Sequence, residues 1–139
     1  MPISSFDIIF VMGVLSMFDD PSISIKNCTR WLKPGGLLII FNMFNNYPID
    51  TWMRFEHYKN ERGREVGWNI PSQARVKDIL LSNGNHNIDF ERFIVDFKRE
   101  PQPEDPMRSW TVDLNNEAYM LNGTWILHPF HFCISTRLN

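Results

Sequence analysis

The chain has 139 residues, of which 43% are apolar and 14% aromatic, enough to bury the core of one domain. Charged residues make up 22% and the formal net charge is -2, so the basic excess expected of a nucleic-acid-binding protein is missing. No apolar run approaches the roughly 18 residues of a membrane-spanning helix, and residues 1–7 lack the basic and apolar regions of a signal peptide.

Two apolar runs near the N-terminus predict a βαβ unit. Residues 6–12 read as a strand buried on both faces, the kind found in parallel sheets. A helix is predicted over residues 21–32, with Asp20 as its N-cap. The Lys-Pro-Gly-Gly turn at 33–36 ends this helix, and residues 37–41 form a second apolar strand. We therefore expect two parallel strands joined by a right-handed crossover.

Residues 42–69 form a polar, aromatic-rich segment. Its apolar spacing predicts a short amphipathic helix near residues 50–60, with Asp50 as a cap, and the charged run 61–65 is expected to be a solvated loop. A further helix is predicted over residues 73–82.

The rest of the chain is predicted to be antiparallel. A strand at 88–97 and a proline-rich loop precede strand-like segments that are separated by Asn-Asn and by the strong hairpin signal Asn122-Gly123: 108–114, 117–121, 124–127 and 130–136. The fold class is thus α/β, a partial doubly wound, Rossmann-like sheet with parallel strands at the start and an antiparallel meander or hairpin at the C-terminus.

The first half carries an ordered series of motifs: Phe-Asp opening an apolar strand at 6–7, Gly-Val-Leu at 13–15, Asp-Asp-Pro at 19–21, and Leu-Lys-Pro-Gly-Gly at 32–36 before another strand. This series resembles the second half of a class I S-adenosylmethionine-dependent methyltransferase. The resemblance implies that the chain starts at the family's fourth strand and ends with its sixth and reversed seventh strands. Residues 1–139 would form one domain, the C-terminal portion of that fold, with a substrate-side insertion at 42–69 and an antiparallel tail at 106–136.

Two features that the family uses to bind its cofactor do not occur in this sequence. They are a glycine-rich loop after the first strand and an acidic residue that holds the ribose hydroxyls. Gly35-Gly36 precedes a strand rather than following one. The resemblance therefore implies part of a methyltransferase that acts on a small molecule, with S-adenosylmethionine as the cofactor of the full-length family. We do not expect this chain to be active by itself.

Two other functions compete with the enzyme. One is a non-catalytic dimerising or regulatory module derived from the same fold. The other is a receiver-like α/β protein, which fits less well because it would need an acidic phosphorylation pocket and leaves the antiparallel tail without a place. What precedes Met1 in the natural gene would separate the enzyme from the module.

The resemblance places the methionine part of the cofactor against Met12, Gly13 and Val14, with Leu15 close by, where backbone carbonyls meet its amino group. The positions after the leucine, where the family often has an acidic residue and a histidine, hold Ser16 and Met17. No proton-transfer role is assigned to them.

Within the insertion, Arg54, His57 and Tyr58 are the weak candidates for catalysis. Arg54 would hold an anionic group and His57 would act as a base, on one face of the expected helix; the alternative is a solvated arginine and histidine. Three aromatic side chains either line an apolar substrate wall or pack in the core: Trp52, Phe55 and Trp68.

Histidine and cysteine spacing predicts no metal site. His128 and His131 flank Pro129-Phe130 without a further spaced set of ligands. Cys28 and Cys133 form no CxxC pair, so neither a disulfide scaffold nor a zinc site is expected, and a cytoplasmic location is the default. Cys28 is expected to be a buried apolar side chain.

The expected partners are a small-molecule methyl acceptor and a polypeptide, with neither nucleic acid nor a membrane. In the family the fourth strand lies inside the sheet, so here the strand Asp7–Met12 would be an exposed apolar edge. Such an edge is a template for pairing with another chain. We expect self-association through this strand, or pairing with a missing N-terminal half.

Overall fold

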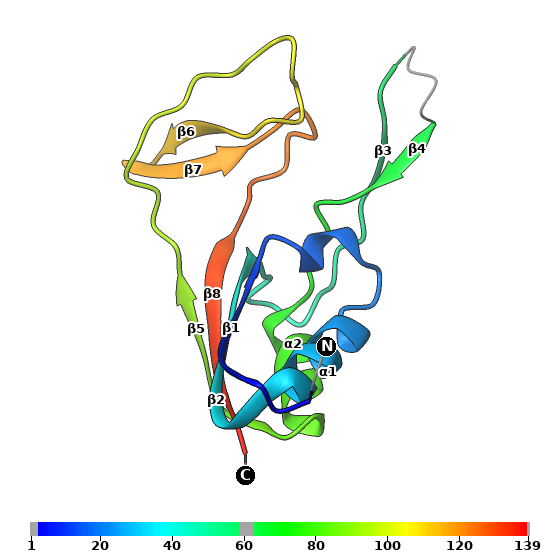
Figure 1. Ribbon diagram of the computed structural model, residues 1–139. Helices are drawn as coiled ribbons and strands as arrows, with labels where there is room; N and C mark the ends of the chain where they lie inside the picture. Colours follow the sequence, from blue (N-terminus) through cyan, green and yellow to red (C-terminus); the bar gives the residue numbers. More distant parts are fainter. Residues whose placement is uncertain (1–2, 59–62, 139) are drawn as a thin grey trace.

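A four-stranded mixed sheet forms the centre of the computed structural model, which describes residues 3–58 and 63–138. The strand order is β1-β2-β8-β5, and Figure 1 shows the two helices on one side of the sheet. β1 (Phe6–Met12) and β2 (Leu32–Met43) are parallel, as predicted, and β8 (Phe130–Arg137) runs antiparallel to β2 and to β5 (Asn85–Arg92). The reversed last strand thus lies between β2 and β5.

The helices match their predicted ranges. α1 spans Ser22–Trp31, with Pro21 at the N-cap position, while the Asp20 carboxylate accepts hydrogen bonds from the amide (3.0 Å) and hydroxyl (2.8 Å) of Ser22. α2 spans Gln73–Ser82. No helix in the described ranges is long and apolar enough to cross a membrane.

The core lies between these helices and one face of the sheet. Leu38 and Ile40 of β2 point into it, and the apolar stripes of α1 and α2 cover them. Its buried members are Leu15, Ile25, Cys28, Leu32, Leu38, Ile40, Phe44, Val76, Leu80 and Cys133.

The Lys-Pro-Gly-Gly segment at 33–36 lies within β2, which follows α1 directly. Four residues bulge out of the strand pair, because Phe6 is opposite Leu32 whereas Ile8 is opposite Leu37. Gly36 is required for the close approach of two backbones, since a Cβ there would lie 2.9 Å from the Lys33 carbonyl oxygen and 3.0 Å from that of Asp7.

The prediction of a helix near residues 50–60 is wrong. The segment instead forms the strand β3 (Arg54–Glu56), which pairs antiparallel with β4 (Arg64–Val66). The reason is a contact distant in sequence: Thr51 and Ile70 exchange two backbone hydrogen bonds of 2.9 Å, which aligns the two ends of the insertion as a ribbon. Within the charged run, residues 61 and 62 lie outside the described residues.

Asp50, expected to cap that helix, serves α2 instead. Its carboxylate accepts hydrogen bonds from the Ser72 amide (2.7 Å) and from Nε of Arg75 (2.6 Å). A carboxylate beside the first turn of a helix is favourable because the free N–H groups there carry partial positive charge.

The C-terminal part holds the predicted hairpin, formed by β6 (Trp110–Leu114) and β7 (Glu117–Leu121). Asn115 and Asn116 make its turn with φ of 52° and 64°, as a two-residue hairpin turn requires. This pair forms a sheet of its own, and β8 returns to the main sheet.

Two predicted strands differ from the structure. The segment 124–127 is not a strand and Asn122-Gly123 is not a hairpin turn, because Gly123 packs against Pro106: its amide donates to the Pro106 carbonyl at 2.7 Å. The strand expected at 88–97 is β5, which begins at Asn85 and ends at Arg92, after which the chain leaves the sheet.

Candidate functional site

A cavity of about 500 Å³ opens where the parallel strands β1 and β2 end. Open α/β sheets bind their ligands at this edge, beyond the carboxyl ends of the strands. The lining is mostly apolar and comes from both strand ends, the short 3-10 helix η1 (Leu15–Met17), the insertion and the start of β8: Met12, Gly13, Ser16, Met17, Phe41, Asn42, Met43, Trp68 and Phe130.

Asn42 fixes η1 against the end of β2. Its side chain is fully buried; Oδ1 accepts the Ser16 amide at 3.1 Å and Nδ2 donates to the Met43 carbonyl at 2.9 Å. The Ser16 hydroxyl donates to the Gly13 carbonyl at 2.8 Å. The two polar side chains of the lining are therefore committed to the cavity wall.

Asn69 attaches the insertion to the same wall. Its backbone N–H donates to the Ser16 carbonyl at 3.0 Å. In its side chain, Nδ2 donates to the Phe18 carbonyl at 3.0 Å and Oδ1 accepts a hydrogen bond from the Met53 backbone N–H at 2.8 Å. These bonds are buried, since Asn69 is 0% exposed. They hold the neighbouring Trp68 over the cavity.

Trp68 has a backbone φ of 59°, which is rare for a bulky side chain and is concentrated at functional sites. Its indole stacks on the imidazole of His128, with ring centroids 4.7 Å apart. His128 is 4% exposed, and burial lowers the pKa of its imidazole to about 4, so the ring is neutral at pH 7.

The nitrogens of His128 have different surroundings. Nδ1 lies 3.4 Å from the Ser109 hydroxyl oxygen, while Nε2 has no hydrogen-bond partner within the described part of the chain. His128 also lines another cavity, of about 320 Å³, beside the β6–β7 hairpin. The stacked pair thus separates the cavity at the strand ends from the cavity beside the hairpin.

Of the residues expected to meet the cofactor, Met12 and Gly13 line the cavity, whereas the other two do not. Val14 points to solvent with 46% exposure, and Leu15 is buried in the core. The following residues, Ser16 and Met17, complete this side of the lining.

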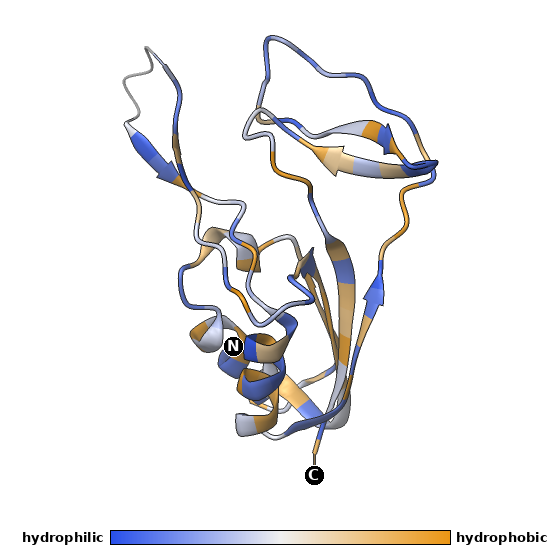
Figure 2. Ribbon diagram, turned by 180° about the vertical axis from the view of Figure 1, so that it is seen from behind, coloured by the Kyte–Doolittle hydropathy of each residue, from blue (hydrophilic) through white to orange (hydrophobic). Residues whose placement is uncertain are grey.

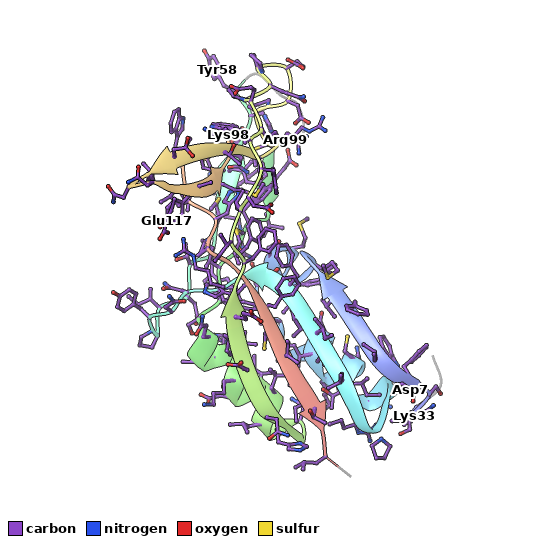
Figure 3. The ribbon with its side chains drawn as sticks, turned by 90° about the vertical axis from the view of Figure 1, so that its left-hand side faces the viewer. Asp7, Lys33, Tyr58, Lys98, Arg99 and Glu117 are labelled. Atoms are coloured by element: carbon purple, nitrogen blue, oxygen red, sulfur yellow. The ribbon has the colours of Figure 1, made fainter. Side chains whose placement is uncertain are left out.

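Arg54, His57 and Tyr58 do not share a helical face, because no helix forms there. All three line a separate cavity of about 470 Å³, between β3 and the segments around Met107 and Thr124. The Arg54 guanidinium bonds Asp19 Oδ2 at 2.6 Å, and His57 Nε2 lies 3.9 Å from Glu65 Oε1. Figure 3 shows Tyr58 far from the sheet.

The three aromatic residues of the predicted substrate wall separate in the structure. Trp68 lines the cavity at the strand ends and Phe55 lines the cavity along β3. Trp52 is 39% exposed and lies beneath the Arg75 guanidinium, 5.7 Å from the ring centroid.

Asn42 and Phe130 line the cavity but were not predicted from the sequence. Asn42 carried a usable signal, because it is the first polar residue after a buried strand and such positions face the ligand edge of the sheet. Phe130 carried none, since only the return of β8 to the sheet places its ring on Phe41, with centroids 5.0 Å apart.

The chemistry of the lining favours a compact cation that requires few hydrogen bonds. The faces of Trp68, Phe41 and Phe130 attract positive charge electrostatically. No carboxylate lines this cavity among the described residues. The described lining therefore suits an apolar or cationic group, but holds no carboxylate that would accept a pair of hydroxyls.

Comparison with known proteins agrees with this geometry. Residues 1–40 match the family model of the methyltransferase domain, a range that covers β1, η1, α1 and the first part of β2. Curated proteins give no significant sequence match.

Several solved structures share the fold. The 1,6-didemethyltoxoflavin-N1-methyltransferase of Burkholderia thailandensis, solved with 1,6-didemethyltoxoflavin and S-adenosylhomocysteine bound, aligns with 100% of the chain at a TM-score of 0.57 and 13% identity. S-adenosylmethionine-dependent methyltransferases of Mesorhizobium loti (99% of the chain, TM-score 0.53, 15% identity) and Methanosarcina mazei (98%, 0.52, 18%) align similarly.

Residues 1–40 are similar in sequence to a methyltransferase domain, and the chain as a whole has the fold of S-adenosylmethionine-dependent methyltransferases. It spans 47% to 64% of the length of these three structures.

Proposed function

We propose that the chain is the C-terminal part of an S-adenosylmethionine-dependent methyltransferase that acts on a small molecule. The observation that carries this proposal is the aromatic and thioether-lined cavity at the carboxyl ends of β1 and β2, inside and beside the segment that matches the methyltransferase family. When bound, the cofactor supplies an electrophilic methyl group on a sulfonium.

The chain's own residues would position that group. Gly13 allows close approach because it has no side chain, and its backbone amide is held by the Phe41 carbonyl at 2.7 Å. The rings of Trp68 and Phe130 face the cationic end and exclude water from it. Methyl transfer gains much of its rate from such positioning.

We further propose that this chain alone does not methylate its substrate. The sequence has no glycine-rich loop after a strand, and no carboxylate borders the described cavity. The hydroxyls of the cofactor would need acceptors from a separate segment. Two free, buried cysteines support a reducing cytoplasm as the compartment.

S-methylmethionine is a suitable probe, because it carries the sulfonium and the amino acid end of the cofactor without the adenosyl group. Titrated to about 20 mM, it is expected to shift the NMR signals of the Gly13 amide and the Trp68 indole in a saturable manner. Methionine, which lacks the positive charge, should act at least about fivefold more weakly.

Trp68→Leu should abolish the preference for the sulfonium at Gly13. Trp125→Leu is the matched control, since Trp125 is 79% exposed and does not line the cavity. Equal shifts by both ligands, or none at Gly13, would refute the proposed role of this cavity.

A further inference from the structure

β1 is an edge strand with unpaired backbone groups. Among the described residues it pairs only with β2. The Gly13 amide bonds Phe41 of β2, and strand geometry alternates the direction of the backbone groups, so the amides of Val11 and Ile9 also face β2. The N–H and C=O groups of Ile8, Phe10 and Met12 therefore point outward, away from the sheet.

The same three residues belong to an apolar sheet face without a helix. Ile9 and Val11 pack on the core, whereas Ile8, Phe10 and Met12 are 48%, 63% and 53% exposed. Figure 3 views this face, with the helices behind the sheet. Strand register places these side chains in rows with the neighbouring apolar residues of β2 and β8: Leu37, Ile39, Phe41, Phe132 and Ile134.

Natural sheet edges are protected from pairing by charged side chains, prolines or bulges. Residues 8–12 contain none of these three. The opposite border of the same face is acidic instead, because Asp89 and Glu91 of β5 lie next to Ile134 and Phe132. Two copies would meet like charges at β5 and none along residues 8–12 of β1.

We propose that two copies of this chain pair through β1, antiparallel and centred on Phe10, so that their sheets join into one. In this register Phe10 is opposite Phe10 of the second copy, Ile8 is opposite Met12, and Ile9 is opposite Val11. All outward backbone groups of Ile8, Phe10 and Met12 are then paired. The twofold axis closes the assembly at two chains.

The composition of β1 fits its own copy. About Phe10 the sequence is symmetric in kind, with β-branched residues at 9 and 11 and long apolar residues at 8 and 12. The exposed ion pair of Asp7 and Lys33 (2.9 Å) falls opposite Gly13 of the second copy, which presents no side chain to it. This inference does not depend on methyl transfer, and it also suits a dimerising module.

Light scattering coupled to size exclusion tests the proposal on the full chain. At about 100 µM we expect twice the chain mass of 16.5 kDa. Phe10→Lys should raise the dimer dissociation constant at least about tenfold, since lysine opposes edge pairing. Ile94→Lys, at a 76% exposed apolar residue beyond the far strand β5, should remain dimeric.

If Phe10→Lys folds poorly, amide hydrogen exchange measured on the unmodified chain still tests the proposal. The amides of Ile8, Phe10 and Met12 should gain protection as concentration rises, while those of Ile9 and Val11 are protected throughout. A monomer at about 100 µM, which would leave the edge to a different polypeptide, overturns the proposal. A dimer without protection at these three amides overturns it equally.

Discussion

The indole of Trp68 lies flat on the imidazole of His128, with the ring planes inclined by 15°. This contact joins the insertion to the segment that leads into β8, two parts of the chain that are 60 residues apart in sequence. It links the wall of the strand-end cavity to the cavity beside the β6–β7 hairpin. The state of the His128 ring therefore matters for the whole region.

Acid should weaken the fold through His128. Because burial lowers its folded-state pKa to about 4 from 6.5, the unfolded chain binds the proton more readily between these values. Its stabilising contribution is complete above pH 6.5 and is lost as the pH falls to about 4, up to about 3 kcal/mol. Urea unfolding of the wild type and His128→Phe should show a smaller loss in the variant.

Burial also lowers the pKa of His131, so part of the acid sensitivity should persist in His128→Phe. The same pH dependence in both proteins would contradict the role assigned to His128.

Removal of the Asn69 side chain should loosen the insertion. Asn69→Ala leaves the buried Met53 amide and the Phe18 carbonyl without this partner, which costs about 1–3 kcal/mol. Asn46→Ala removes an exposed amide that bonds Gln73 at 2.8 Å, and should change stability by no more than about 0.5 kcal/mol. Denaturant midpoints measure both; equal effects would disprove the assignment.

Gly36→Ala should destabilise the turn into β2. An added Cβ would lie 2.9 Å from one backbone oxygen and 3.0 Å from another, so the strand pair must shift, at about 1–3 kcal/mol. Gly67→Ala is the buried control, because its nearest neighbour is Met17 Sδ at 3.5 Å, an ordinary contact. In thermal unfolding, the midpoint temperature of Gly36→Ala should lie well below that of Gly67→Ala.

The two thiols should be inert in the folded protein. Burial raises the pKa of Cys28, and that of Cys133 rises to about 12 through burial and the nearby Asp89. Since the thiolate is the reactive form, a thiol-specific disulfide reagent should label neither cysteine at pH 7.5 and both after denaturation. Rapid labelling of native protein would show that the core opens at α1 or β8.

Local signals predicted most of the framework. Capping residues and apolar periodicity located α1 and α2, and the uninterrupted apolar runs identified β1 and β2 as parallel strands. Met12 and Gly13, which the family resemblance places against the cofactor, line the cavity at the strand ends.

Features that depend on distant contacts were not predictable in this way. Residues 50–58 have apolar spacing that suits a helix, yet the bonds between Thr51 and Ile70 make a strand ribbon. Asn122-Gly123 has the composition of a hairpin turn, but its glycine serves the close approach to Pro106. The stack of Trp68 on His128 arises only when both segments are in place.

The position of β8 between β2 and β5 has a consequence for how the protein forms during synthesis. Both neighbours leave the ribosome before the strand that must join them. Until then β2 and β5 are unpaired along their facing sides, and their unpaired N–H and C=O groups favour aggregation. The sheet therefore closes last at its centre, and loss of β8 would remove the strand that joins β2 to β5.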